Sequence, residues 1–91
     1  MSKPVDRVAV ISSKFLDDLR YWIETDRKTA LRVITLMAAI LAEPFAGIGK
    51  PEPLRFELAG CWSRRITQEH RLVYRVTTGH IEFHQARYHY E

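Results

Sequence analysis

Two neighbouring segments in the middle of the chain alternate between apolar and polar side chains, and this alternation is the strongest constraint on the fold. The segments are residues 62–67 and 71–76, and Gln68, Glu69 and His70 are the expected connection between them. Successive side chains of a strand point to opposite faces of a sheet, so the pattern predicts an antiparallel strand pair. The predicted apolar face consists of Trp62, Ile66, Leu72, Tyr74 and Val76. The opposite, cationic face consists of Ser63, Arg65, Thr67, Arg71, Val73 and Arg75.

Arg64 does not fit this division of the two faces. Strict alternation places its guanidinium on the apolar face, and a β-bulge is one way to displace it. We therefore expect an irregularity in the first of the two strands.

Two amphipathic helices are predicted before these strands. A short β-branched run at residues 7–11 predicts a strand, after which Ser12 or Ser13 can cap a helix. The apolar positions of this helix are Phe15, Leu16, Leu19, Trp22 and Ile23. Asp18 falls largely off that stripe. A second helix is expected to start after Thr25 or Asp26 and to run to about Ala42, with a wide apolar face.

The second half of the chain predicts a loop followed by strands. Pro44, Gly47 and Gly49 interrupt the helical pattern, and strands are expected at residues 54–58 and 81–88 in addition to the alternating pair. The predicted order is β-α-α-β-β-β-β. We therefore expect one α+β domain over residues 1–91, with residues 1–6 as a flexible lead-in and both helices on one face of a largely antiparallel sheet. The other face is expected to be free for binding.

The charge distribution favours an anionic partner. The formal net charge is +3 and the pI is near 9.3. The excess lies at residues 50–75, which hold six Lys or Arg against Glu52, Glu57 and Glu69. Such a face suits a polyanion such as RNA, although a merely solvated surface is the alternative.

The expected location is a reducing cytoplasm, without a membrane. Cys61 is the only cysteine, which excludes an internal disulfide and a cysteine metal cluster. The longest uncharged apolar run, residues 33–42, is about half of what a membrane span needs. His80 and His84 have a spacing that suits a metal on a helix, but the preceding turn residues predict a strand, so no metal or other cofactor is expected.

Several side chains could together cleave RNA without a metal. This reaction needs a base for the 2′-hydroxyl, an acid for the departing 5′-oxygen and cations for the phosphorane. Glu52, held between Pro51 and Pro53, is the candidate base; Arg65 and Arg71 are candidate phosphate ligands, and His89 is the candidate acid. The alternatives are a solvated Glu52 and arginines that only bind RNA or pair with Glu57 and Glu69.

Four motifs in this order closely resemble the YoeB toxins, which belong to the RelE and ParE toxin superfamily. The motifs are YWIETD (Tyr21–Asp26), PF with GKPEPL (Pro44, Phe45 and Gly49–Leu54), WSRRIT with EHRLVY (Trp62–Tyr74) and the terminal RYHY (Arg87–Tyr90). The resemblance extends from about Arg7 to Tyr90. It implies the RelE-like microbial RNase fold.

The resemblance also implies an activity and roles for individual residues. It implies the toxin of a type II toxin–antitoxin pair, a ribosome-dependent endoribonuclease that cuts mRNA in the A site. Glu52 would be the general base, Arg71 would stabilise the scissile phosphate, and His89 would be the general acid. Lys50, Arg65 and Tyr90 match positions that support the substrate.

The partners that the resemblance implies are the ribosome, mRNA, a YefM-like antitoxin with an acidic C-terminal segment and, as a homodimer, a second copy of the toxin. Two other functions are considered beside this one: a non-catalytic ParE-like topoisomerase poison and a plain RNA-binding module. The glutamate and the terminal histidine argue against the topoisomerase poison, because that relative does not need them.

Overall fold

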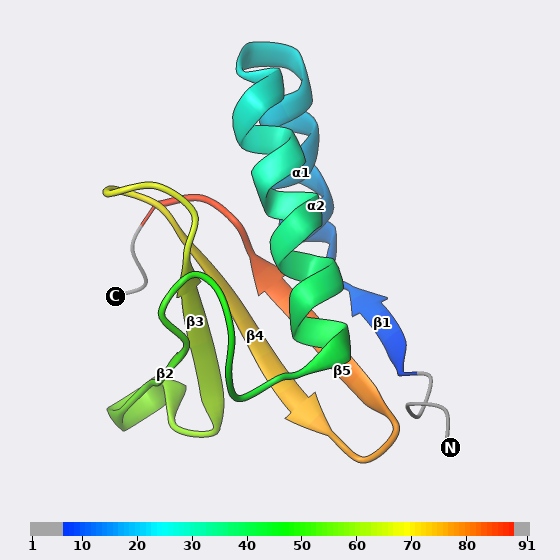
Figure 1. The fold of residues 1–91 in the computed structure, drawn as a ribbon, viewed down its shortest axis with the longest axis vertical. Helices are drawn as coiled ribbons and strands as arrows, with labels where there is room; N and C mark the ends of the chain where they lie inside the picture. The colour runs from blue at the N-terminus through cyan, green and yellow to red at the C-terminus, as the bar shows by residue number, and fades with distance from the viewer. Residues whose placement is uncertain (1–6, 89–91) are drawn as a thin grey trace.

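The computed structural model describes residues 7–88, which form an α+β domain (Figure 1). The elements are β1 (Val8–Ile11), α1 (Ser13–Thr25), α2 (Arg27–Ala42), β2 (Glu52–Pro53), the 3-10 helix η1 (Phe56–Leu58), β3 (Cys61–Arg65), β4 (Arg71–Thr77) and β5 (His80–Gln85). The sheet order is β1-β5-β4-β3-β2. Only β1 with β5 is parallel among these described pairings, so the predicted element order and the largely antiparallel sheet are confirmed.

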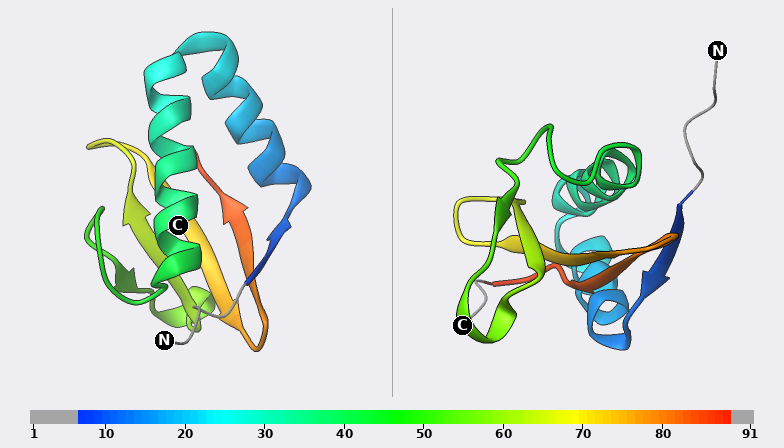
Figure 2. Two further views of the ribbon diagram at one scale, coloured as in Figure 1. Left: turned by 45° about the vertical axis from the view of Figure 1, so that its right-hand side comes forward. Right: turned by 90° about the horizontal axis from the view of Figure 1, so that it is seen from below.

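The two helices form an antiparallel pair whose connection extends beyond the sheet (Figure 1, Figure 2). Ser12 caps α1 by accepting a hydrogen bond from the Phe15 N–H, and Asp26 caps α2 by accepting one from the Thr29 N–H. Each cap satisfies a backbone donor that has no partner inside its helix. Ser12 is one of the two predicted caps of α1, and α2 begins after Asp26, one of its two predicted starting points.

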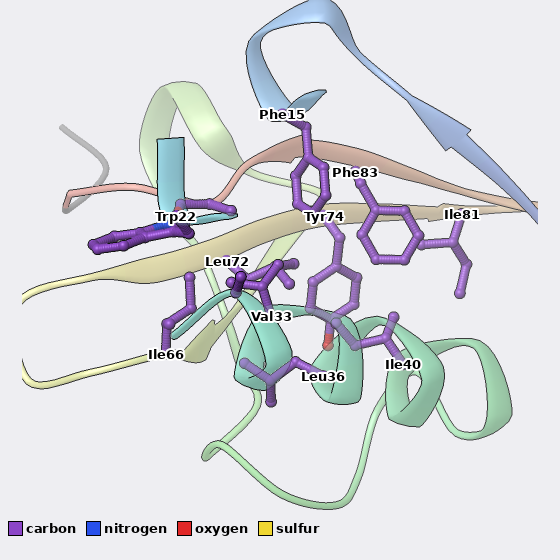
Figure 3. Close-up of a cluster of buried hydrophobic side chains, with 12 residues drawn as sticks. Phe15, Trp22, Val33, Leu36, Ile40, Ile66, Leu72, Tyr74, Ile81 and Phe83 are labelled. Carbon is purple, nitrogen blue, oxygen red and sulfur yellow. The ribbon is translucent and has the colours of Figure 1, made fainter. Parts of the chain in front are cut away.

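Both helices contribute to one core on the inner face of the sheet (Figure 3). Leu72 and Tyr74 of β4 meet Ile81 and Phe83 of β5 there, and the ring of Phe83 lies 5.3 Å from that of Phe15. Burial of each large apolar side chain contributes about 1.5–3 kcal/mol. From α2, the core contains Ala30, Val33, Leu36 and Ile40. The predicted apolar face is therefore the one that the helices cover.

The register of β3 and β4 confirms which residues share the opposite face, which we call the outer face. Ser63 pairs with Val73, and Arg65 pairs with Arg71, so their side chains point away from the helices. Between Val73 and Tyr74 the register with β5 shifts. The described irregularity thus lies in the β4–β5 pairing, where His84 is the extra residue of β5, and the expectation that a bulge displaces Arg64 in β3 was wrong.

The strand predicted at residues 54–58 was also wrong. Pairing with β3 occurs earlier, at Glu52 and Pro53, where an edge position tolerates a proline. At Phe56 the backbone enters the left-handed region, with φ of 57°, and the chain turns into η1. Leu54 and Leu58 then fold over the outer face.

The outer face is consequently less open than expected. Leu54, Cys61 and Val73 form a second buried cluster there, with Leu58 packed against it. Residues 54–58 therefore cover part of the face that was predicted to be free for binding. The part of that face near Arg65 remains exposed.

Two further expectations differ from the structure. The last strand ends at Gln85, three residues before the predicted Tyr88. Asp18, expected largely off the apolar stripe, is buried because its carboxylate accepts a hydrogen bond from the Ala86 N–H at 2.9 Å and pairs with Lys14.

Within residues 7–88, no helix is both long and apolar enough to cross a membrane.

Candidate active site

Glu52 reaches the outer face because the chain before it passes very close to β3. The Gly49 carbonyl accepts a hydrogen bond from the Arg65 N–H at 2.6 Å. Gly49 has φ of 84°, and a Cβ at this position would lie 2.9 Å from Leu36 Cδ2. Only glycine adopts this conformation freely and permits this approach. The crossing places Glu52 opposite Ser63 at the edge of the sheet, with its side chain exposed.

The loop that leads to this crossing is held by Arg64. The Arg64 side chain is fully buried; its Nη2 donates to the carbonyls of Glu43 at 2.6 Å and Ala46 at 2.9 Å, and Nη1 donates to Ile48 at 3.1 Å. Its Nε donates to the Tyr74 hydroxyl, which in turn donates to the Pro44 carbonyl. A buried charge is stable only when its donors are satisfied, and here loop carbonyls satisfy them. The alternating pattern marks Arg64 as out of place on the apolar face, but it does not indicate these hydrogen-bond partners.

Arg65 and Arg71 lie opposite each other on neighbouring strands and form the cationic part of the site. The Arg71 Nη1 donates to the carbonyls of Thr67, Gln68 and His70, which fixes the guanidinium over the β3–β4 turn. Neither arginine forms an ion pair with a carboxylate of residues 7–88, so the cross-strand pairs with Glu57 and Glu69 are not seen there. Two guanidinium groups at paired positions on one face of the sheet suit the binding of an anion.

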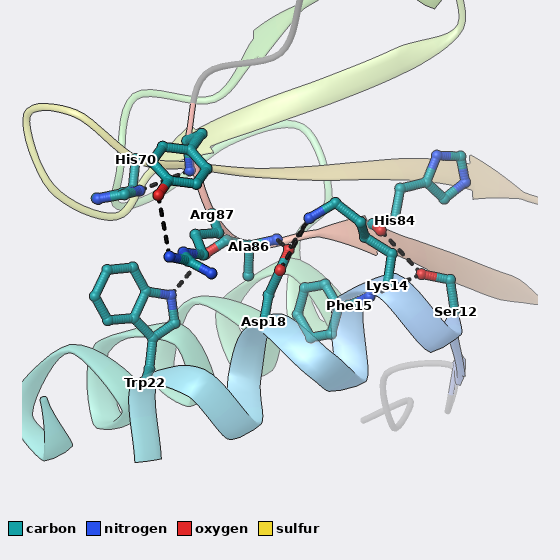
Figure 4. Close-up of polar contacts among 10 residues, drawn as sticks. Ser12, Lys14, Phe15, Asp18, Trp22, His70, His84, Ala86 and Arg87 are labelled. Atoms are coloured by element: carbon teal, nitrogen blue, oxygen red, sulfur yellow. Dashed lines mark hydrogen bonds and ion pairs between the residues drawn. The ribbon is translucent and has the colours of Figure 1, made fainter. Parts of the chain in front are cut away.

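The chain after β5 is anchored from two sides (Figure 4). The Ala86 carbonyl accepts a hydrogen bond from Trp22 Nε1 at 2.8 Å, and the Ala86 N–H donates to Asp18. The Tyr88 backbone N–H donates a hydrogen bond to His70 Nδ1 at 2.6 Å, and the Tyr88 carbonyl accepts one from the Arg71 N–H at 3.1 Å. This part of the chain is therefore fixed beside Arg71.

The contact with Tyr88 gives His70 a defined role that sequence reasoning missed. Because Nδ1 accepts a hydrogen bond, it has no proton, and the neutral ring must have its proton on Nε2. The ring also packs edge-on against Trp22, with centroids 4.8 Å apart. His70 lies in the predicted turn, and the only signal in the sequence was its place within the EHR motif.

His89 and Tyr90, the other two predicted site residues, lie outside the described residues. The preceding motif residue Arg87 is described, and its guanidinium stacks 3.5 Å from the ring centroid of Tyr21. This stack joins the terminal RYHY motif to the YWIETD motif. Lys50 is exposed, with φ of 52°, two residues before Glu52.

A second polar group on the outer face involves Glu82, between His80 and His84 on β5. His84 Nε2 lies 3.1 Å from the Glu82 carboxylate and His80 Nε2 lies 3.4 Å from it. Hydrogen bonds from His84 and then His80 lower the pKa of Glu82. Burial raises the pKa of the nearby Cys61 thiol, which disfavours the nucleophilic thiolate. Residues 7–88 contain no group of three or more His, Cys, Asp or Glu that could hold a metal.

Beside Glu52 the outer surface is hollowed. Residues 52–58 curl around a hollow of about 640 Å³. Phe56, at its rim, is 92% exposed. Sequence reasoning placed Phe56 in a strand and so missed this feature.

Comparison with known proteins adds a family to this geometry. The family model described as the YoeB-like toxin of bacterial type II toxin–antitoxin systems matches residues 11–90. Toxin YoeB of Mycobacterium bovis is 54% identical over 74 residues, which cover 81% of this chain and 87% of that protein.

Solved structures of similar proteins agree with this match. A YoeB/ParE toxin from Agrobacterium tumefaciens superposes with a TM-score of 0.88 at 42% identity, covering 91% of this chain and 99% of the other. A YoeB dimer from Staphylococcus aureus gives 0.85 at 37% identity, covering 93% and 99%. A heterotetrameric YoeB–YefM complex from S. aureus gives 0.83 at 38% identity, covering 92% and 98%.

Proposed function

This chain belongs to the family of YoeB-like toxins of bacterial type II toxin–antitoxin systems, and we propose that it is a ribosome-dependent endoribonuclease that cleaves mRNA in the A site without a metal. The observation that supports this most directly is the position of Glu52 on the face that also presents Arg65 and Arg71. A carboxylate and two guanidinium groups without ion-pair partners among the described residues supply the base and the cations that phosphate transesterification requires.

In the proposed reaction the RNA supplies its own nucleophile. Glu52 takes the proton of the 2′-hydroxyl, and the 2′-oxygen then attacks the adjacent phosphorus. The bond from phosphorus to the 5′-oxygen breaks, and His89 gives its proton to that oxygen. The products are a 2′,3′-cyclic phosphate and a 5′-hydroxyl. The reaction as proposed therefore consumes no water and uses no metal ion.

The arginines would act on the charge that develops during the attack. The phosphorane has more negative charge on its oxygens than the ground-state phosphate, and preorganised guanidinium groups stabilise it preferentially. The Nη1 of Arg71 already contacts the turn carbonyls, which leaves its remaining donors to meet phosphate oxygens. Arg65, Lys50 and Tyr90 would help to hold the substrate.

The proposed protein partner is a YefM-like antitoxin. The S. aureus relative assembles with YefM in a heterotetramer, and the cationic outer face of this chain offers the complementary charge for an acidic segment. Such a segment would compete with mRNA for Arg65 and Arg71. A homodimer is proposed from the S. aureus YoeB dimer.

Primer extension on a defined mRNA in a reconstituted translation system tests the enzymatic proposal. The wild-type protein should cut ribosome-bound message within A-site codons, and the Glu52→Gln and His89→Gln variants should not cut it. Glu52 is exposed, so its substitution should change stability by no more than about 0.5 kcal/mol. Intact message with the folded wild-type protein would refute the proposal, and inhibited DNA supercoiling in its place would favour a topoisomerase poison.

A further inference from the structure

The hollow formed by residues 52–58 lies beside the proposed general base but has no part in the proposed chemistry. Its volume of about 640 Å³ is within the range of ligand sites. Glu52 lines it at one end, and Phe56 and Leu58 contribute apolar surface. A group bound there would lie beside Glu52.

Phe56 is the most unusual residue of this segment. Its side chain is 92% exposed, although Leu54 and Leu58 on either side pack toward the outer face. Its backbone φ is 57°, a conformation that an aromatic L-residue rarely adopts. The fold thus holds an aromatic ring in solvent at a strained position, an arrangement that is concentrated at binding sites.

The charges around the hollow decide between possible occupants. Its lining has two carboxylates, Glu52 and Glu57, and one cation, Arg55. This balance disfavours a phosphate in the hollow, because Arg65 and Arg71 on the sheet are better ligands for it. It also disfavours an acidic peptide. A neutral, flat, aromatic group that can stack on Phe56 is favoured, and an unpaired nucleobase has these properties.

We propose that this hollow, with Phe56 as its stacking platform, is a subsite for one unpaired nucleobase of the mRNA next to the scissile phosphate. The subsite depends on the proposed endoribonuclease function, since it is the cleavage reaction that places RNA at Glu52. The base stacks on the Phe56 ring while its phosphate lies toward the arginines. Stacking tolerates any base, so the subsite contributes affinity and position rather than a fixed sequence requirement.

The test compares three substitutions in the full chain bound to programmed ribosomes. The mRNA has a 2′-deoxynucleotide at the cleavage position, so that it is not cut, and the fluorescent base 2-aminopurine in the A-site codon. Phe56→Leu keeps an apolar side chain without a ring, and Phe56→Trp keeps a ring. Leu31→Ala is the control, because this exposed residue lies in the first turns of α2, at the opposite end of the molecule from η1 (Figure 1).

Phe56→Leu should raise the Kd about tenfold and abolish the stacking quench of 2-aminopurine, while Phe56→Trp should stay within about threefold of wild type. On cleavable message, Phe56→Leu should raise KM by a similar factor. All three variants should keep the wild-type melting temperature, since both positions are exposed.

An unchanged Kd and quench in Phe56→Leu would overturn the subsite. If that variant binds RNA normally but loses affinity for an acidic model peptide, the platform is a protein contact, and the proposal is also overturned. The endoribonuclease function fails separately: wild-type protein that quenches 2-aminopurine without cutting cleavable message would retain the subsite and refute the enzyme.

Discussion

Replacing Arg64 with methionine should destabilise the protein severely, although Arg64 is one of the basic residues of the cationic sequence. Methionine has a similar length but none of the donors. The substitution would remove the hydrogen bonds to the carbonyls of Glu43, Ala46 and Ile48 and to the Tyr74 hydroxyl. The loop before Glu52 would lose the contacts that fix its course.

The size of the effect follows from what each of these acceptors loses. An unsatisfied buried acceptor costs about 1–3 kcal/mol, but the loop residues are exposed enough for water to replace part of the loss. The Tyr74 hydroxyl also keeps its bond to Pro44. We therefore expect the free energy of unfolding to fall by about 3–5 kcal/mol, comparable to breaking a buried charge pair.

Urea unfolding followed by tryptophan fluorescence measures this difference, because Trp22 is buried and Trp62 packs against the core. The midpoint should fall by about 2 M, given a slope of 1–3 kcal/mol per molar urea. Arg65→Met is the matched control, since its side chain is on the exposed outer face: stability should change by about 0.5 kcal/mol or less, while cleavage is lost. A loss below about 1 kcal/mol for Arg64→Met would refute this account of the loop.

Three further predictions concern the supports of the site. Gly49→Ala should reduce the cleavage rate about a hundredfold, because φ of 84° is strained for alanine and its Cβ would lie 3.3 Å from the Arg65 carbonyl oxygen, so that the chain that positions Glu52 would shift. An unchanged rate would show that the close approach is dispensable. His70→Phe should reduce kcat, because it removes the acceptor for the Tyr88 N–H while keeping a ring against Trp22. His70→Asn, whose Oδ1 restores an acceptor, should recover part of the lost kcat. Equal rates in the two variants would contradict a role for the hydrogen bond from the Tyr88 N–H. Glu82→Gln should be less stable than wild type at pH 7 but not at pH 3. Because the pKa of Glu82 is lowered from 4.5 in the folded state, the stabilisation by its carboxylate is present above pH 4.5 and is lost as the pH falls below that value. Urea midpoints of both proteins at the two pH values measure this difference.

The sequence alone determined the regular elements and their faces. Alternation over residues 62–67 and 71–76 predicted the inner and outer faces of β3 and β4, and the register of Ser63 with Val73 confirms them. The cap at Ser12 and the start of α2 after Asp26 were also predicted. These features could be predicted because side-chain periodicity and capping depend on residues within one or two turns of each other.

The candidate site was only partly accessible to such reasoning. Glu52, Arg65 and Arg71 were selected from their chemistry and from the resemblance to YoeB toxins, and the structure brings all three to one face. The roles of His89 and Tyr90 stay predictions. Nothing in the local pattern indicated that Phe56 would be turned into solvent by a positive φ, because the same residues read equally well as a strand.

Only the tertiary structure decided how the polar misfits are used. Arg64 was expected to be displaced by a bulge, yet it stays on the apolar face because carbonyls 16 to 21 residues earlier in the chain satisfy it. Asp18 is buried because Ala86, 68 residues later, donates to it. The free energy of burying a polar group depends on whether a partner is present, and that partner is supplied by the fold rather than by the neighbouring sequence.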